Sequence, residues 1–272
     1  MPLPRRPSGR RCFGPLSLCA GTAFGYDSDP APETYMTSMM VEAGIKTGLD
    51  RAGIAKFDLL GFDACLMASV ELVVQFAPYC RHFMASEELE PGTGWDWTSL
   101  SSLNKDPSMS ALAFATAMAD GFMSDPKKKG ASATQLTMSI TDMSAVTSFS
   151  DAVERLAQAL VNAMADLSIM TALSAAKDTA YRMGDDFVDF GHLLQQLSSD
   201  ARLDGRIELK ELINTTLRAY SSAMVFNKHS DDLLGPSGLS CARALRPLYW
   251  CRLCVLQMSP DIMYVYCRCH RI

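Results

Sequence analysis

The chain has 272 residues, of which 48% are hydrophobic, and its formal net charge is −5 at pH 7. This length and apolar content are enough for one domain with a substantial core, and no run of 18 apolar residues predicts a membrane span. The weak acidity, without a basic stripe along the body of the chain, argues against nucleic acid as a partner.

The amino-terminal segment differs in composition from the rest. Four arginines and no acidic residue precede Asp27, and prolines recur in residues 1–12. Prolines and like charges disfavour a strand, so we expect residues 1–20 to form an atypical arginine- and proline-rich terminus. The same composition is found in organelle transit peptides, and the localisation of the protein stays open.

The body of the chain alternates between predicted helices and strands. Apolar spacing predicts helices over residues 33–52, 68–76, 108–123 and 150–167, and strands over residues 55–62, 82–86 and 135–140. Such alternation is typical of an α/β fold, in which helices cover a mostly parallel sheet.

A single thiol follows the first of these strands. Residues 57–62 are apolar but for Asp58, and Gly61 and Asp63 interrupt the run just before Cys65. We therefore expect the thiol at the carboxyl edge of a parallel sheet, where catalytic and ligand sites gather. The alternative is a structural thiol, since cysteine is among the residues most often buried.

Two windows of sequence carry a family resemblance. Residues 61–67, with the thiol, and the glutamate-rich residues 84–97 together resemble the clostripain family of cysteine endopeptidases. The likeness covers roughly residues 21–240 and is weaker around residues 186–190 and 238–240. It implies a caspase-like three-layer sandwich, with a mostly parallel sheet flanked by helices. It also implies cleavage after Arg or Lys by a cysteine and histidine dyad.

The resemblance assigns roles to three residues. Cys65 falls on the family's nucleophile, Asp63 on a position that lines the pocket for the substrate's basic side chain, and Asp96 is a looser candidate for a second pocket acid. The chemistry agrees for Asp63, because a carboxylate beside a thiol disfavours the thiolate but attracts a guanidinium strongly. The expected partners are peptide or protein substrates with Arg or Lys at the cleavage site.

The general base is the part of the family pattern that this chain lacks. The family carries it in a His-Gly motif upstream of the segment that matches residues 21–27, but the first histidine here is His82. We expect His82 at a strand start, His192 at a helix start and His229 in a polar loop, and none matches a family motif.

This departure has two consequences. We predict that the sheet lacks an inner strand at its amino-terminal end, and that the chain as written is an incomplete and inactive peptidase, because a positioned base contributes roughly a hundred- to ten-thousand-fold in rate. The alternative is a non-catalytic relative that acts as a binding or interaction module.

Cysteine usage marks a change near residue 240. Residues 21–240 contain Cys65 and Cys80, whereas residues 241–272 contain five cysteines. The pattern Cys251-x2-Cys254-x12-Cys267-x-Cys269-His270 offers zinc ligands at an unusual spacing, and disulfides are another interpretation. A third is that both ends are out-of-frame or intronic sequence, which divides the chain into residues 1–20, a peptidase body over 21–240, and a cysteine-rich tail over 241–272.

No cofactor or metal is assigned from the sequence. Asp27 and Asp29 form an acidic pair, but the prolines that follow and the absence of further ligands at regular spacing favour an ordinary loop. A calcium requirement stays open.

Overall fold

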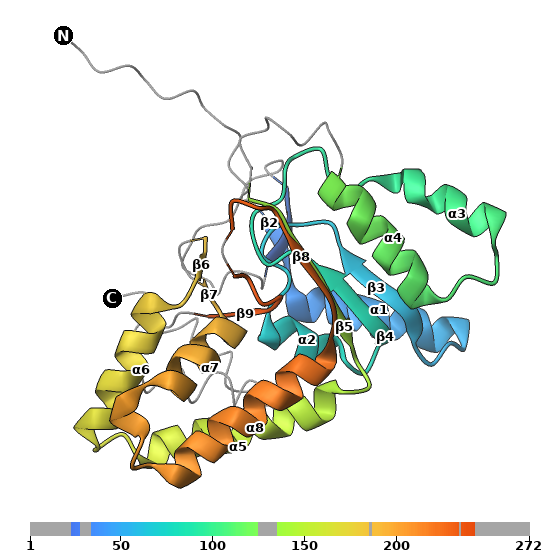
Figure 1. Ribbon diagram of the computed structural model, residues 1–272. Coiled ribbons are helices and arrows are strands. Elements are labelled where there is room, and N and C mark those ends of the chain that lie inside the picture. The colour runs from blue at the N-terminus through green and yellow to red at the C-terminus, as the bar shows by residue number, and fades with distance from the viewer. Residues whose placement is uncertain (1–22, 28–33, 125–134, 185–186, 234, 243–272) are drawn as a thin grey trace.

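A computed structural model describes residues 23–27, 34–124, 135–184, 187–233 and 235–242 (Figure 1). The strands are β1 (Ala23–Asp27), β2 (Thr34–Thr37), β3 (Phe57–Phe62), β4 (Cys80–Ala85), β5 (Thr137–Asp142), β6 (Arg182–Met183), β7 (Phe187–Asp189), β8 (Met224–His229) and β9 (Ser240–Ala242). The α-helices are α1 (Ser38–Ala52), α2 (Val70–Phe76), α3 (Leu100–Lys105), α4 (Ala111–Ser124), α5 (Val146–Asn162), α6 (Leu167–Thr179), α7 (Phe190–Ser199) and α8 (Ile207–Ala223). Two 3-10 helices are η1 (Trp97–Ser99) and η3 (Ala201–Leu203).

The central sheet has the strand order β3-β4-β5-β8. Strands β3 and β4 are parallel, whereas β4 pairs with β5, and β5 with β8, in antiparallel fashion. The prediction of a mostly parallel sheet is therefore wrong for the described strands, since the sheet is mixed. Strand β5 runs opposite to β4 because the connection through α3 and α4 brings the chain back to the end of the sheet at which β4 finishes, where Ala85 pairs with Ser139. The α/β class itself is confirmed.

Helices cover both faces of this sheet. Side chains alternate across a strand, and in β4 Phe83 packs into a core with α2, α5, α7 and α8, whereas Met84 packs into a second core with α4. Figure 1 shows α4 on one side of the sheet and α5 and α8 on the other. The layers are therefore helix, sheet and helix, as expected.

A smaller sheet joins distant parts of the chain. Its order is β6-β7-β9, both pairings are antiparallel, and β9 pairs Cys241 with Val188 of β7. Ser240 also forms a parallel bridge to Ser69, just before α2. The carboxyl end of the described chain is thus fixed against the start of α2.

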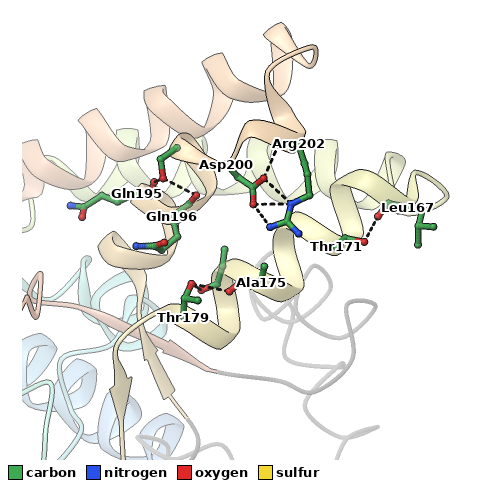
Figure 2. A network of polar contacts seen from close by, with 10 residues as sticks. Leu167, Thr171, Ala175, Thr179, Gln195, Gln196, Asp200 and Arg202 are labelled. Atoms are coloured by element: carbon green, nitrogen blue, oxygen red, sulfur yellow. Dashed lines mark hydrogen bonds and ion pairs between the residues drawn. The ribbon is translucent and has the colours of Figure 1, made fainter.

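Polar contacts define the ends of α6 and α7 (Figure 2). Thr171 Oγ1 donates to the carbonyl of Leu167 at 2.7 Å. After α7, Asp200 accepts the backbone N–H of Arg202 at 2.9 Å and forms an ion pair with its guanidinium, with Nη2 and Oδ2 2.6 Å apart. Asp200 thereby starts η3 in the manner of an N-cap residue.

Two predicted helices differ from the structure. Residues 34–37, predicted as helix, form β2, and α1 begins at Ser38 after Thr37, whose side chain accepts the N–H of Met40. The helix predicted over residues 150–167 ends at Asn162, and Asp166 caps the separate helix α6. Leu167, placed in the core by its spacing, is 80% exposed. Local capping by Thr37 and Asp166 overrides a continuous apolar pattern.

Most of the predicted terminal segments lie outside the described residues. Residues 1–20 and the tail cysteines from Cys251 onward are in this category, and so is Asp29. Strand β9 continues the described chain to Ala242, and Cys241 within it is buried. Within the described parts of the chain, no helix combines the length and apolarity needed to cross a membrane.

Candidate active site

The thiol of Cys65 lies in a turn at the carboxyl end of β3. Residues 63–67, called the thiol turn below, follow Phe62, and Leu66 has a φ of 62°, a left-handed conformation that is uncommon for a branched residue. Such conformations persist where the surrounding structure determines them, and they cluster at functional sites. The backbone geometry thus marks the residue next to the thiol as constrained.

A segment of three buried glutamates holds the thiol turn. Residues 86–90, called the glutamate segment, follow β4, and Glu87, Glu88 and Glu90 are 0%, 7% and 7% exposed. The N–H of Leu66 donates to the Glu88 carbonyl at 3.2 Å, and the N–H of Ala68 donates to the Ser86 carbonyl at 2.8 Å. These bonds run in the opposite sense to the parallel β3–β4 register, and they keep the thiol turn beside the glutamate segment.

Glu90 contacts the sulfur directly through its backbone. Its N–H donates to Cys65 Sγ at 3.2 Å, and Sγ lies 3.8 Å from its carbonyl oxygen. The N–H contact is available to a thiolate as well as to a thiol, whereas the carbonyl contact requires the S–H hydrogen. The thiol is partly exposed and can meet a ligand.

The other described cysteines have different surroundings. Cys80 and Cys241 are fully buried, and Cys80 Sγ donates to the Phe76 carbonyl at 3.6 Å. Burial raises the pKa of the Cys80 thiol to about 12. A structural role therefore fits Cys80, whereas Cys65 has the exposure and donor that a reactive thiol needs.

Asp63 and Trp95 join the thiol turn to the loop after the glutamate segment. Asp63 is exposed, and its Oδ2 accepts the backbone N–H of Trp95 at 3.0 Å. The indole N–H of Trp95 donates to Glu90 Oε1 at 3.0 Å, and its ring lies over Gly61, where a Cβ would be 2.7 Å from the ring. Trp95 thus contacts both Asp63 and Glu90 and positions their side chains relative to β3.

Asp96 is directed elsewhere by its own contacts. Its carboxylate caps η1, accepting the N–H of Thr98 at 3.0 Å and the Thr98 hydroxyl at 2.8 Å. A Cβ added to Gly121 of α4 would lie 3.1 Å from Asp96 Oδ2. The structure therefore brings Asp63 and Cys65 into one turn, and it places the Asp96 carboxylate against α4.

The three described histidines belong to elements other than the thiol turn. His82 is in β4, paired with Leu59, and its Nδ1 is 3.2 Å from the carbonyl oxygen of Asp58. On α7, Nδ1 of His192 accepts the backbone N–H of Tyr181 at 3.1 Å. His82 lies in a strand and His192 at a helix start, as expected.

His229 was expected in a loop, but it ends β8. It pairs with Thr137, at the same sheet edge as Cys65. Strands β8 and β3 are three positions apart in the sheet, which corresponds to roughly 14 Å at about 4.8 Å per spacing. This is the distance between the strands, and Thr137, the partner of His229, accepts the N–H groups of Glu87 and Glu88 in the glutamate segment.

The three buried glutamates of residues 86–90 were not predicted to have a role in the site. Burial raises the pKa of Glu88, which its bonds from the N–H groups of Leu89 and Gly184 partly oppose. Among the described residues, no group of three or more His, Cys, Asp or Glu side chains is arranged to hold a metal ion. The sequence signal that could have identified these glutamates is the presence of three acidic residues just after a predicted strand.

Comparison with known proteins relates this geometry to a family. The family model described as the clostripain family, Peptidase_C11, matches residues 25–234. No curated protein matches the chain.

Several solved structures share the fold. A clostripain from Bacteroides thetaiotaomicron in complex with a peptide inhibitor has a TM-score of 0.57 at 16% identity, over 83% of this chain and 92% of that chain. A B. fragilis cysteine protease has a TM-score of 0.57 at 16% identity, over 90% and 93%. A secreted C11 cysteine protease from B. thetaiotaomicron has a TM-score of 0.59 at 16% identity, over 87% of this chain and 65% of that chain.

Proposed function

The chain belongs to the clostripain family of cysteine peptidases, and on this premise we propose that Cys65 is its nucleophile and that Asp63 binds the Arg or Lys side chain that precedes the cleaved bond. The observation that carries the proposal is the thiol turn itself. It presents a partly exposed thiol and an exposed carboxylate two residues apart, at the end of a strand. Asp96 is proposed as a second pocket acid, with its capping of η1 as a competing role.

The reaction requires a base in addition to these groups. The base takes the proton of the Cys65 thiol, and the thiolate attacks the carbonyl carbon of the basic residue. The amide C–N bond breaks as the protonated base returns that proton to the leaving amine, and water then hydrolyses the thioester to release the acid and the free thiol. Since His82, His192 and His229 lie elsewhere, we propose that the described part of the chain binds basic peptides without turning them over at an enzymatic rate.

An additional strand beside β3 is part of this proposal. Strand β3 is at the end of the described sheet order, and Phe57 in it is 37% exposed. An edge strand of this kind offers backbone groups for a further strand to pair with. A base carried on such a strand would be one spacing from β3, about 4.8 Å. The alternative function is a non-catalytic module that holds basic side chains through Asp63.

An active-site probe tests the proposal. The B. thetaiotaomicron clostripain was solved with the peptide inhibitor BTN-VLTK-AOMK, whose peptide part ends in lysine. We expect the same inhibitor to modify Cys65 of this chain, as read by mass spectrometry of the modified peptide. Asp63→Asn should slow this modification at least tenfold relative to alkylation by iodoacetamide, which the loss of the neighbouring charge should not slow. An inhibitor that ends in leucine is the matched control.

The outcomes separate the functions. Modification at Cys65 that depends on Asp63, without turnover of a lysine peptide, supports the proposal as stated. Turnover that disappears in Cys65→Ser would show an active enzyme and refute the predicted inactivity. If iodoacetamide reacts and the lysine inhibitor does not, in a protein folded by circular dichroism, the peptidase assignment fails. Binding of a lysine peptide in that case, lost in Asp63→Asn, supports the alternative.

A further inference from the structure

The side chain of Glu87 connects the central sheet to the end of the described chain. Glu87 follows β4 after one residue and is fully buried. Its Oε2 accepts the N–H of Gly238 at 3.0 Å, a residue 151 positions later in the sequence. Its Oε1 is also buried, and it has no donor among the described residues. A carboxylate in this position would therefore have one of its oxygens unsatisfied.

Asp189 is the second carboxyl group at this point. It is also fully buried, and it begins α7 by accepting the N–H of His192 at 2.6 Å. It accepts the Ser237 hydroxyl at 2.6 Å and, in a short contact, the Ser237 N–H. Three donors directed at one carboxyl group are the surroundings of a carboxylate. We therefore assign the negative charge of the pair to Asp189.

Glu87 then carries a proton. The Glu87 and Asp189 carboxyl groups accept the N–H groups of the adjacent residues Gly238 and Ser237, which brings the two carboxyl groups together. A hydrogen bond between them requires a proton, because two carboxylates have no hydrogen to donate. Burial raises the pKa of Glu87 well above its usual range, and the charge of Asp189 raises it further. A proton on Oε1 would let Glu87 donate to Asp189 while Oε2 accepts from Gly238, so that both Glu87 oxygens would be satisfied.

Among the described residues, the titratable groups coupled to Glu87 are acidic. Glu88 is on the same segment, Asp189 is at the start of α7, and Tyr220 is on α8. The Tyr220 hydroxyl accepts the N–H of Leu239 at 3.0 Å, and burial and the two carboxyl groups raise its pKa well above its usual value. Loss of the Glu87 proton would therefore place a second negative charge in a buried site with acidic neighbours.

Glu87 is also the first glutamate of the glutamate segment, and its backbone is held as well. Its N–H and that of Glu88 both donate to Thr137 Oγ1 at 2.9 Å. The carbonyl of Glu88 accepts the N–H of Leu66, and the N–H of Glu90 donates to Cys65 Sγ. Its side chain fastens the segment to Gly238 and Asp189, while the backbone on either side holds the thiol turn.

We propose that Glu87 is a positioning residue: as a neutral acid bonded to Asp189 it holds the glutamate segment in place, and its ionisation at higher pH releases that segment from Asp189 and the thiol turn with it. The functional meaning rests on the proposed role of Cys65. The release itself does not, so it can be measured without any peptidase assay.

Hydrogen exchange tests the proposal. Amide exchange of peptides that cover residues 64–68 and 86–90 is measured from pH 6 to pH 9 in the wild type and in Glu87→Gln. Glutamine keeps both bonds and cannot ionise. Because an opened Glu87 ionises with an ordinary pKa, the opening equilibrium of the wild type should rise about tenfold per pH unit until the buried Glu87 itself titrates. The ratio of wild-type to Glu87→Gln exchange should follow that slope, since intrinsic exchange cancels.

Other outcomes contradict the proposal. A ratio that does not change with pH would show that opening of the segment is not coupled to ionisation of Glu87. Failure of Glu87→Gln to fold would show that a neutral donor does not replace the Glu87 side chain. Asp189→Asn is the second variant, because removing the charge of residue 189 should lower the pH at which the slope ends. A pH-dependent ratio together with no inhibitor adduct on Cys65 would retain the positioning role and reject the proposed function.

Discussion

Thr137 offers a sharp test of how the glutamate segment is held. Its Oγ1 accepts the N–H groups of Glu87 and Glu88, both at 2.9 Å, and lies 3.0 Å from the Ser86 hydroxyl. Ser86 Oγ in turn donates to the Glu88 carbonyl at 2.9 Å. Since two N–H groups occupy the lone pairs of Thr137, its own hydrogen goes to Ser86. One hydroxyl thus makes three hydrogen bonds in a buried position.

Thr137→Val removes that hydroxyl and keeps the shape of the side chain. Valine is as suitable for a strand as threonine, so the change falls on the hydrogen bonds. Two backbone N–H groups would be left buried without an acceptor, at about 1 to 3 kcal/mol each. We expect the free energy of unfolding to fall by roughly 2 to 6 kcal/mol.

Urea denaturation followed by circular dichroism measures this change. The matched control is Thr141→Val on the same strand, because Thr141 is equally buried but donates only to the sulfur of Met224, 3.7 Å away. A thioether is a weak acceptor, so this control should lose less than about 1 kcal/mol. If the two variants are equally stable, the three-bond network at Thr137 does not hold the glutamate segment as described.

Three further predictions concern other parts of the site and fold. Gly61→Ala should lower the melting temperature and slow modification by the lysine inhibitor, because the added methyl group would lie 2.7 Å from the indole ring of Trp95. Gly44→Ala is the control, since Gly44 faces open space on α1 and the change should raise the free energy of unfolding by about 0.5 to 1 kcal/mol. Equal effects of the two changes would refute the contact with Trp95. At pH 8, iodoacetamide should alkylate Cys65 well before Cys80, whose pKa of about 12 leaves roughly one thiol in ten thousand ionised, and comparable rates would contradict the burial of Cys80. Folding raises the pKa of Glu87, so the folded protein keeps a proton on Glu87 that the unfolded chain releases above about pH 4.5. The free energy of unfolding of the wild type, relative to Glu87→Gln, should therefore fall by about 1.4 kcal/mol per pH unit as the pH rises. Denaturation midpoints of the two proteins that move in parallel with pH would disprove this prediction.

The position of the thiol could be predicted from the sequence because its signals are local. An apolar run, a glycine and an aspartate specify a strand end, and β3 does end at Phe62, three residues before Cys65. Strand direction is different, since alternation predicted the strand that begins near residue 135 but says nothing of its orientation. Helices α3 and α4 decide that orientation, through the edge of the sheet to which they return the chain.

The buried acid pair could not be predicted for a related reason. Glu87, Asp189 and Gly238 are far apart in the sequence, and charged residues are normally exposed unless paired. Nothing near Glu87 shows that a proton and a distant carboxylate will satisfy it. Asp96 illustrates the reverse case, where a local signal competes with an assigned role, because an aspartate two residues before Thr98 is also a good cap for a short helix.

The geometry also limits where a catalytic base can come from. His229 lies at the same edge of the sheet as Cys65, but β4 and β5 separate its strand from β3. A base on a segment paired along the outer edge of β3 would be about 4.8 Å away, and it would also cover Phe57. We therefore propose that a base for the family reaction approaches Cys65 from the β3 edge. Measuring turnover with and without a segment that pairs there tests both this base and the predicted additional strand, and turnover that does not depend on the segment would refute the proposal.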